Sequence, residues 1–369
     1  MSSQPAAPRY GIDAYMEWVE KEGLRVIDVP YADLLDLPLG DWPRYGCKGA
    51  AVHLRGRCDF SNMFLLELAP GASTEPLRHL YEDVYYVLEG SGCTQVETAA
   101  GKHVFEWGPK SMFSVPLNAR HQHFNGSGKT RARIVTTTDM PLVMNTFHNE
   151  EFVFDTPFDF TDRKGKDKYF AGEGDLLLVR PGNHMWETNF VPDMERIELQ
   201  SFGARGAGGT SIMFVLADGL MHAHMSEIPV GTYKKAHRHP PGFHVMCVTG
   251  HGYSLLWYEG DKDFVRVDWR HGVVFPPEDG QLHQHFNTSA EPARYLATRV
   301  GGMRYPFTME RRRSMMGERP GAEATNSKSV RDGGDQIEYE DQDPRIHALW
   351  LEEMAKVGVE PKMSAFIKK

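Results

Sequence analysis

Cysteine is scarce in this chain of 369 residues, which contains four: Cys47, Cys58, Cys93 and Cys247. No two of them form a CxxC pair. A few cysteines without such a motif are typical of reduced thiols, and they predict a cytoplasmic protein.

Other absences narrow the range of partners. No apolar run approaches the ~18 residues of a membrane-spanning helix, and residues 1–5 lack the charged and apolar regions of a signal peptide. The net charge is −9 and no basic stripe is present. We therefore expect neither a membrane nor a nucleic acid as a partner.

The sequence also lacks several catalytic motifs. It contains no GxSxG and no clear Ser/His/Asp order, so nucleophilic hydrolysis is not expected. It contains no P-loop and no GxGxxG after a strand, so neither nucleotide phosphate nor NAD is implied.

Glycine (36) and proline (23), by contrast, are plentiful and spread along the chain. This distribution is typical of a fold with many short strands joined by turns. Helices are expected mainly near the two ends of the chain. Residues 15–22 form one, with Asp13 as its N-cap, and a second begins at Pro344 with Asp343 as its cap. Residues from about Arg304 onward are also expected to turn helical.

The strand-rich regions are copies of one another. Six residues of the first region recur 160 positions later, and these are Glu67, Gly71, Arg78, His79, Gly90 and Gly92. The pentapeptide His-Gln-His-Phe-Asn at residues 121–125 returns intact at 283–287. Five identical residues in the same context indicate an internal duplication.

Histidines of the second copy predict a metal site. His237 and His239 stand two residues apart, so on a strand their side chains project to the same face. His244 and His283 follow in later strands and are able to complete a site on that face. Nitrogen-rich sites of this kind suit Fe, Mn, Ni, Cu or Zn better than Ca or Mg.

These segments resemble the two motifs of the cupin superfamily. Residues 231–250 resemble the first motif, G-x5-H-x-H-x(3,4)-E-x6-G, and residues 280–287 resemble the end of the second, P-x-G-x2-H-x3-N. The resemblance covers roughly residues 50–135 and 210–300. It implies a bicupin, a mainly β protein with two small antiparallel jelly-roll β-barrels and helices at both ends. The expected parts are an N-terminal helical extension (1–48), a first barrel (49–140), an inter-domain connection (141–209), a second barrel (210–303) and a C-terminal helical extension (304–369).

The resemblance implies that His237, His239, His244 and His283 bind a divalent transition metal. Fe(II) is the favoured ion, and Mn, Zn and Ni are alternatives. His244 stands in place of the usual carboxylate, although its spacing to Gly250 is one residue shorter than in the family. Its role as a ligand is therefore left open.

The first copy of the motifs is incomplete. Leu77 stands where the first ligand is expected, whereas His79, Asp83 and His121 are retained. Two interpretations stay open: this barrel binds a metal weakly through these three residues, or it has kept the fold and lost the site.

The second barrel is most similar to gentisate dioxygenase-type ring-cleavage enzymes. This likeness rests on the His-Gln-His-Phe-Asn segment and on residues 236–240. It implies a non-haem iron dioxygenase acting on a small aromatic or enolic acid, in a homo-oligomer (dimer or tetramer). Two alternatives stay open: a redox-neutral metal-dependent lyase, decarboxylase or isomerase, and a bicupin that binds a small molecule without turnover.

Further residues of the second barrel are candidates for contact with the substrate. His285 lies two residues beyond His283, so it is the candidate for proton transfer, with roles as an alternative ligand or as a hydrogen-bond donor left open. His222 and His224 alternate on the preceding strand. Candidate anion-binding arginines are Arg238, Arg266, Arg294, Arg299 and Arg304.

Overall fold

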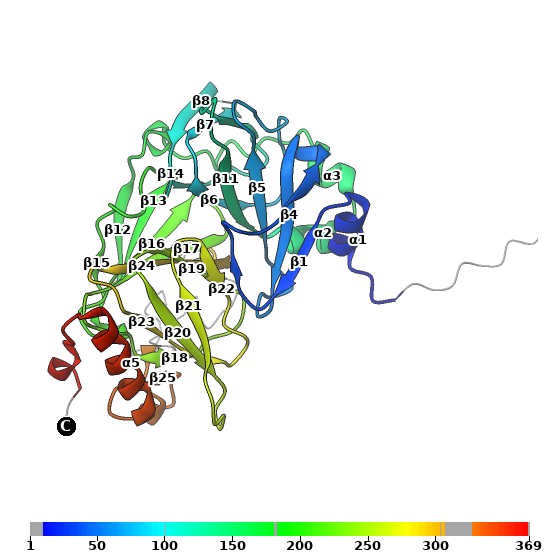
Figure 1. Cartoon of the computed structure of the whole chain (residues 1–369). Helices are drawn as coiled ribbons and strands as arrows, with labels where there is room; N and C mark the ends of the chain where they lie inside the picture. Colours follow the sequence, from blue (N-terminus) through cyan, green and yellow to red (C-terminus); the bar gives the residue numbers. More distant parts are fainter. Residues whose placement is uncertain (1–9, 100, 181–182, 303, 307–326, 368–369) are drawn as a thin grey trace, which may run out of the picture.

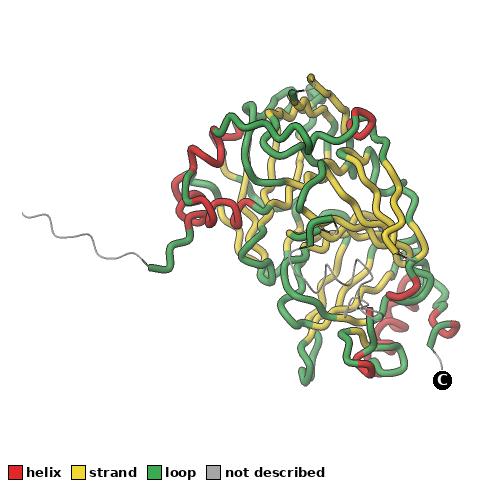
Figure 2. The backbone as a smooth tube through the Cα atoms, turned by 180° about the vertical axis from the view of Figure 1, so that it is seen from behind, coloured by secondary structure: helices red, strands yellow, loops and turns green. Residues whose placement is uncertain are grey.

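The computed structural model describes residues 10–367, apart from residues 100, 181–182, 303 and 307–326. Four β-sheets make up most of this described part, and they form an upper and a lower barrel in Figure 1. Helices lie at the periphery in the reverse view of Figure 2. The mainly β fold expected from the sequence is confirmed.

The first barrel combines a larger and a smaller sheet. The larger follows the order β1-β4-β5-β11-β6-β9-β14, with β3 paired to β4, and the smaller follows the order β10-β7-β8. The strands are β1 (Val26–Val29), β3 (Gly40–Trp42), β4 (Cys47–Leu54), β5 (Asn62–Leu68), β6 (Asp83–Glu89), β7 (Gly92–Thr98), β8 (Gly101–Trp107), β9 (Met112–Phe113), β10 (Arg120–Asn125), β11 (Ala132–Thr138) and β14 (Phe190–Val191).

The second barrel repeats this plan. Its larger sheet follows the order β12-β13-β16-β17-β24-β19-β22-β2, with β15 paired to β16, and its smaller sheet follows the order β21-β20-β23-β18-β25. The strands are β2 (Ala32–Asp33), β12 (Asp175–Arg180), β13 (Asn183–Thr188), β15 (Gln200–Ser201), β16 (Thr210–Leu216), β17 (Met221–Ile228), β18 (Ala236–His237), β19 (His244–Thr249), β20 (Gly252–Trp257), β21 (Val265–Trp269), β22 (Val273–Phe275), β23 (Leu282–Asn287), β24 (Ala293–Val300) and β25 (Gln336–Ile337).

Each barrel contains the same core order of strands. The run β4-β5-β11-β6-β9 of the first barrel corresponds to β16-β17-β24-β19-β22 of the second, and β10-β7-β8 corresponds to β23-β20-β21. The sequence repeat is therefore a repeat of topology.

The two barrels also exchange strands. β2, from the N-terminal part of the chain, pairs with β22 of the second barrel, and β14 pairs with β9 of the first. Residues 141–209 were expected to connect the barrels and to pack over a surface, and within them β12, β13 and β15 extend the sheet of the second barrel. A reason is that an unpaired edge strand leaves backbone polar groups without partners.

Apolar side chains from both larger sheets pack between the barrels. Leu65 and Val135 of the first barrel belong to the same buried cluster as Met225 and Leu296 of the second. At the centre of this interface the hydroxyls of Thr137 and Thr298, on repeat-related strands, lie 2.7 Å apart.

The N-terminal helix α1 (Ala14–Lys21) begins as expected, because the carboxylate of Asp13 accepts a hydrogen bond from the backbone N–H of Met16. Its buried residues Tyr15 and Trp18 face the first barrel. Two helices lie beside it at the right of Figure 1, and these are α2 (Met140–Phe147) and α3 (Glu150–Asp155). Together the three helices cover one end of the first barrel.

The C-terminal helix α5 (Pro344–Val357) is capped by Asp343, as expected, and packs on the smaller sheet of the second barrel through Trp350 and Met354. The helical segment expected beyond Arg304 falls largely on residues 307–326, outside the described part of the chain. Single 3-10 turns are η1 (Pro43–Tyr45), η2 (Asp167–Phe170), η3 (Gly203–Arg205), η5 (Val330–Asp332) and η6 (Met363–Ala365). Within the described residues, no helix has the length and apolar character needed to cross a membrane.

Candidate metal centre

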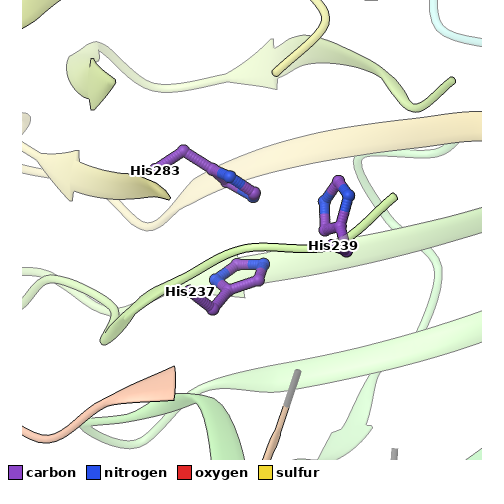
Figure 3. Close-up of side chains that lie close together, drawn as sticks. All are labelled: His237, His239 and His283. Atoms are coloured by element: carbon purple, nitrogen blue, oxygen red, sulfur yellow. The ribbon is translucent and has the colours of Figure 1, made fainter. Parts of the chain in front are cut away.

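Three imidazoles of the second barrel converge on one point. His237 ends β18, His239 follows in the next loop, and His283 lies on β23 directly opposite His237 in the strand register. Their candidate ligand nitrogens all lie within 4.8 Å of one another. Figure 3 shows the three rings turned toward a common centre. The structure thus brings together three of the four residues that the sequence singled out as ligands.

Hydrogen bonds orient two of the rings. Nδ1 of His239 lies 2.9 Å from the carbonyl oxygen of Pro240, and Nδ1 of His283 lies 3.2 Å from that of Gln281. A carbonyl oxygen only accepts, so each Nδ1 must carry the proton and donate it. Each Nε2 then keeps its lone pair, which is the arrangement that metal-binding histidines show.

The donor set fits a transition metal. Burial is the main cause that lowers the pKa of all three rings, and it takes the pKa of His283 to about 3. Neutral imidazole is the form that binds metals. Nδ1 of His237 is in addition buried without a hydrogen-bond partner among the described residues. Three neutral nitrogen donors suit Fe, Mn, Ni, Cu or Zn.

His244 does not join this group, and the expectation of a fourth ligand there needs correction. Its side chain lines a small cavity between the two barrels, together with Met63, Thr137 and Thr298. Strand alternation is the reason: the neighbours Phe243 and Val245 pack in the apolar cluster of the second barrel, so His244 points the other way. Burial lowers the pKa of His244 to about 4.

Phe243 occupies the position that the family's carboxylate takes. It lies 160 residues after Asp83, and its ring centroid is 4.6 Å from that of His239. The repeat offset was a signal that the sequence analysis did not use. An apolar residue at this position leaves the three histidines without a charged partner on this side.

His285 lies inside the barrel next to the triad, at 5.4 Å between its ring centroid and that of His283. Its Nδ1 is 2.8 Å from the hydroxyl of Ser254, which accepts a hydrogen bond from the indole N–H of Trp269. Burial holds the pKa of His285 well below its usual range. The ring is thus neutral and fixed in direction.

His222 and His224 pack against the same phenylalanine ring, Phe243, as His239. Nε2 of His222 is 2.9 Å from Nδ1 of His224, and both rings pack edge-on against Phe243. The sequence analysis missed two cations nearby, the buried Lys234 and the half-buried Arg205. Both lower the pKa of His285 through their charge.

Four of the five candidate arginines are held in ion pairs. These pairs are Arg238 with Asp335, Arg266 with Glu353, Arg294 with Glu227 and Arg304 with Glu187. Only Arg299 among the five lies by the pocket, with its guanidinium carbon 4.5 Å from the ring centroid of Phe243.

The corresponding residues of the first barrel are occupied by other partners. Nδ1 of His79 bonds to the carbonyl oxygen of Tyr81, and its Nε2 is 3.3 Å from Asp83. Asp83 accepts hydrogen bonds from Tyr85 and Thr136. Among the described residues, only His237, His239 and His283 form a group placed to hold a metal. This geometry favours the interpretation that the first barrel has lost its site.

Strand order, repeat and motif placement together define the class of fold. In the first barrel the two motifs lie on β6 and β10. In the second barrel they lie on the corresponding strands, β19 and β23. The chain therefore has the bicupin fold, and the cupin resemblance of its motifs is confirmed.

Comparisons with known proteins give one partial relative and several distant structures. No protein-family model matches the chain. A 5-aminosalicylate 1,2-dioxygenase from a Comamonas species is 37% identical over 76 residues, which are 21% of this chain and 19% of that enzyme. The chain thus matches about a fifth of the length of its curated relative.

Solved structures that are similar include two oxalate decarboxylases and a vicilin. The Lactobacillus farciminis decarboxylase in complex with formate is 14% identical, with a TM-score of 0.48, over 79% of this chain and 90% of that chain. A single-residue variant of the Bacillus subtilis decarboxylase is 12% identical, with a TM-score of 0.47, over 85% and 90%. Vicilin from Capsicum annuum is 12% identical, with a TM-score of 0.46, over 73% and 85%. Likeness at this level carries no argument about a reaction.

Proposed function

We propose that this bicupin is a metal-dependent oxygenase in which His237, His239 and His283 hold Fe(II), and that its substrate is a small aromatic or enolic acid. The observation that carries the proposal is the set of three converging imidazoles, two buried and one half-buried, two of which have their Nε2 atoms freed by Nδ1–carbonyl hydrogen bonds. Three ligands leave open positions on the ion for other molecules.

The charge of the pocket supports an acidic substrate. The ligands are neutral, and Phe243 replaces the carboxylate that would have offset the charge of the ion. Lys234 and Arg205 add positive charge. An anion entering this pocket therefore meets no negative group from the ligand set.

The residues of the pocket have separate roles in this proposal. Iron(II), when bound, supplies the redox chemistry that allows reaction with dioxygen. Ser254 holds Nδ1 of His285, so Nε2 is the ring nitrogen left for proton transfer with a substrate hydroxyl near the triad. Phe243 and Phe275 pack against the imidazoles and restrict the access of water.

The partial relative supports the same class of reaction. The 76 matched residues belong to an enzyme whose name describes a dioxygenase acting on an aminosalicylate, which is an aromatic acid. 5-Aminosalicylate and 2,5-dihydroxybenzoate are therefore the first compounds to test, followed by other hydroxybenzoates, catechols and β-diketones. A homo-oligomer, dimer or tetramer, belongs to the same proposal.

Reconstitution tests the proposal directly. Metal-free protein is loaded with Fe(II) under nitrogen, its metal content is measured, and oxygen uptake is followed across the compound panel. We expect one bound Fe per chain and substrate-dependent oxygen uptake, both abolished in His283→Ala. Protein that holds one Fe and consumes no oxygen with any compound contradicts the proposal.

The same preparation separates the alternatives. Turnover under nitrogen with Mn, Zn or Ni indicates a redox-neutral lyase, decarboxylase or isomerase. Tight binding of a panel compound without turnover under any condition indicates a binding protein.

A further inference from the structure

We propose that Lys234 is the residue that binds the carboxylate of the acid in the second barrel. The proposal deepens the proposed function, on which it rests for the acidic character of the substrate. The observation behind it is a buried ammonium that lacks an anionic partner among the described residues and lies beside the imidazoles.

Lys234 is placed next to the pocket by its backbone. Its N–H donates to the carbonyl oxygen of His285 on the neighbouring strand, at 3.0 Å. Its side chain is 3% exposed, and Nζ lies 5.4 Å from the ring centroid of Tyr295. Tyr295 in turn packs against His285, with 4.8 Å between the ring centroids. A ligand held at Nζ therefore lies beside the proton-transfer candidate.

The ammonium lacks a partner that would stabilise its charge. Among the described residues, none forms a hydrogen bond with Nζ. Glu227 is the acid whose charge acts on Lys234, but its carboxylate is bound to Arg294 at 2.7 Å. The face of Tyr295 attracts the cation only weakly compared with the cost of taking an ammonium out of water.

Nearby charge makes an anion still more favourable. Burial first, and then the charge of Arg205, lower the pKa of Lys234 to about 7. A carboxylate is the group that suits this positive environment, because it accepts hydrogen bonds and carries negative charge.

The neighbouring lysine provides a matched control. Lys235 forms an ion pair with Glu338, and its Nζ lies near the ring of Tyr339, outside the barrel. Removing its charge leaves the pocket unchanged. Each variant removes one ammonium: Lys234→Met removes the one near Tyr295, and Lys235→Met removes the one paired with Glu338.

Calorimetry with benzoate and its neutral analogue benzamide tests the assignment, in both the metal-free and the Zn(II)-loaded protein. We expect the wild type and Lys235→Met to bind benzoate at least about tenfold more tightly than benzamide. In Lys234→Met we expect benzoate affinity to fall about 10- to 100-fold, as for the loss of a charge-assisted hydrogen bond, with benzamide affinity unchanged. Equal benzoate affinity in Lys234→Met and wild type overturns the proposal, as does a wild type without preference for benzoate.

Thermal unfolding guards against a folding artefact. Lys234→Met removes an uncompensated buried charge, so we expect its melting temperature to equal or exceed that of the wild type. A lower melting temperature means that Lys234 has a structural partner, and this too overturns the proposal. Benzoate binding is measured without turnover. The test of Lys234 therefore remains valid even if the protein consumes no oxygen and the proposed reaction is wrong.

Discussion

The two barrels share one strand order and differ in what fills them. Four positions of the first barrel hold Asn62, Phe64, Leu66 and Leu77, and 160 residues later the same positions hold His222, His224, Ser226 and His237. In the first barrel Phe64, Leu66 and Leu77 form one apolar cluster with Tyr15 and Trp18 of α1. A barrel of this size is thus either filled by its own core or kept as a polar pocket.

Aromatic packing completes the filling of the first barrel. Tyr81 stacks on His79 with 3.7 Å between the ring centroids, and its hydroxyl is 2.8 Å from that of Tyr45. These rings therefore belong to the packed, buried part of the first barrel. Of the three proposed ligands only His237 differs from its counterpart, Leu77, whereas His239 and His283 correspond to His79 and His121.

Other features are the same in both barrels. The chain of hydrogen bonds Trp107–Thr94–His123 of the first barrel corresponds to Trp269–Ser254–His285 of the second. Likewise, the ion pair between Glu67 and Arg133 corresponds to that between Glu227 and Arg294. Because these contacts occur in both copies, we infer that they support the fold of each barrel.

The largest expected effect is a loss of bound metal when a histidine is removed from the second barrel but not when its counterpart is removed from the first. We expect His283→Ala to reduce metal affinity at least about 100-fold, more than the loss of a group that only supports a ligand. His121→Ala, the equivalent change in the first barrel, should leave the metal content at one ion per chain. Metal analysis after dialysis against a weak chelator measures both. Loss of metal in His121→Ala would show that the first barrel has kept a site.

The next largest effect is a fall in kcat when His285 is replaced, which tests whether this residue acts in the reaction or only in the fold. We expect His285→Gln to lower kcat by about 10²- to 10⁴-fold with metal content retained, because a proton acceptor is lost. His123→Gln should leave kcat unchanged. Each variant should also lose about 1–3 kcal/mol of unfolding free energy, because a buried hydroxyl loses its partner. An unchanged kcat in His285→Gln assigns His285 to the fold alone.

A third effect is a pH dependence carried by Asp83. Burial raises the pKa of this carboxyl from 3.8 to about 7. Between these two values the folded chain holds a proton that the unfolded chain has released, so stability falls as the pH rises, by up to about 1.4 kcal/mol per pH unit. We expect Asp83→Asn to remove this slope and to gain stability relative to the wild type toward pH 7. Urea unfolding at pH 5, 6 and 7 measures the difference, and a pH-independent difference contradicts it.

The smallest effect concerns the interface between the barrels. The hydroxyls of Thr137 and Thr298 have each other as partners and are buried. We expect Thr137→Val or Thr298→Val to cost about 1–3 kcal/mol each, because the remaining hydroxyl loses its partner. The double variant should be close to the wild type, since two apolar groups of the same shape then meet. Additive losses in the double variant would show that the two hydroxyls do not depend on each other.

Much of the fold was predictable because duplication leaves a record in the sequence. The offset of 160 predicted two copies of one strand-rich unit, and the cupin resemblance implied that each copy is a barrel. The HxH spacing predicted that His237 and His239 share a face, to which His283 was expected to add a third ligand. Helix caps were also local signals, as Asp13 and Asp343 show. The exchange of β2 and β14 between the barrels was not predictable, because two-residue strands are defined only by the partner they meet.

His244 and Lys234 mark the limit of sequence reasoning. The sequence alone determined the repeat, the residue types of the site and the replacement of the first ligand by Leu77 in the first copy. Only the tertiary structure decided which side chains face inward. His244 points to the interface and Phe243 to the pocket, although both stand near the expected ligand position. The Lys234 ammonium lies over the ring of Tyr295, while Lys235 pairs with Glu338. The physical reason is that a shift of one residue turns a strand side chain to the opposite face, and that shift depends on pairing with strands distant in the sequence.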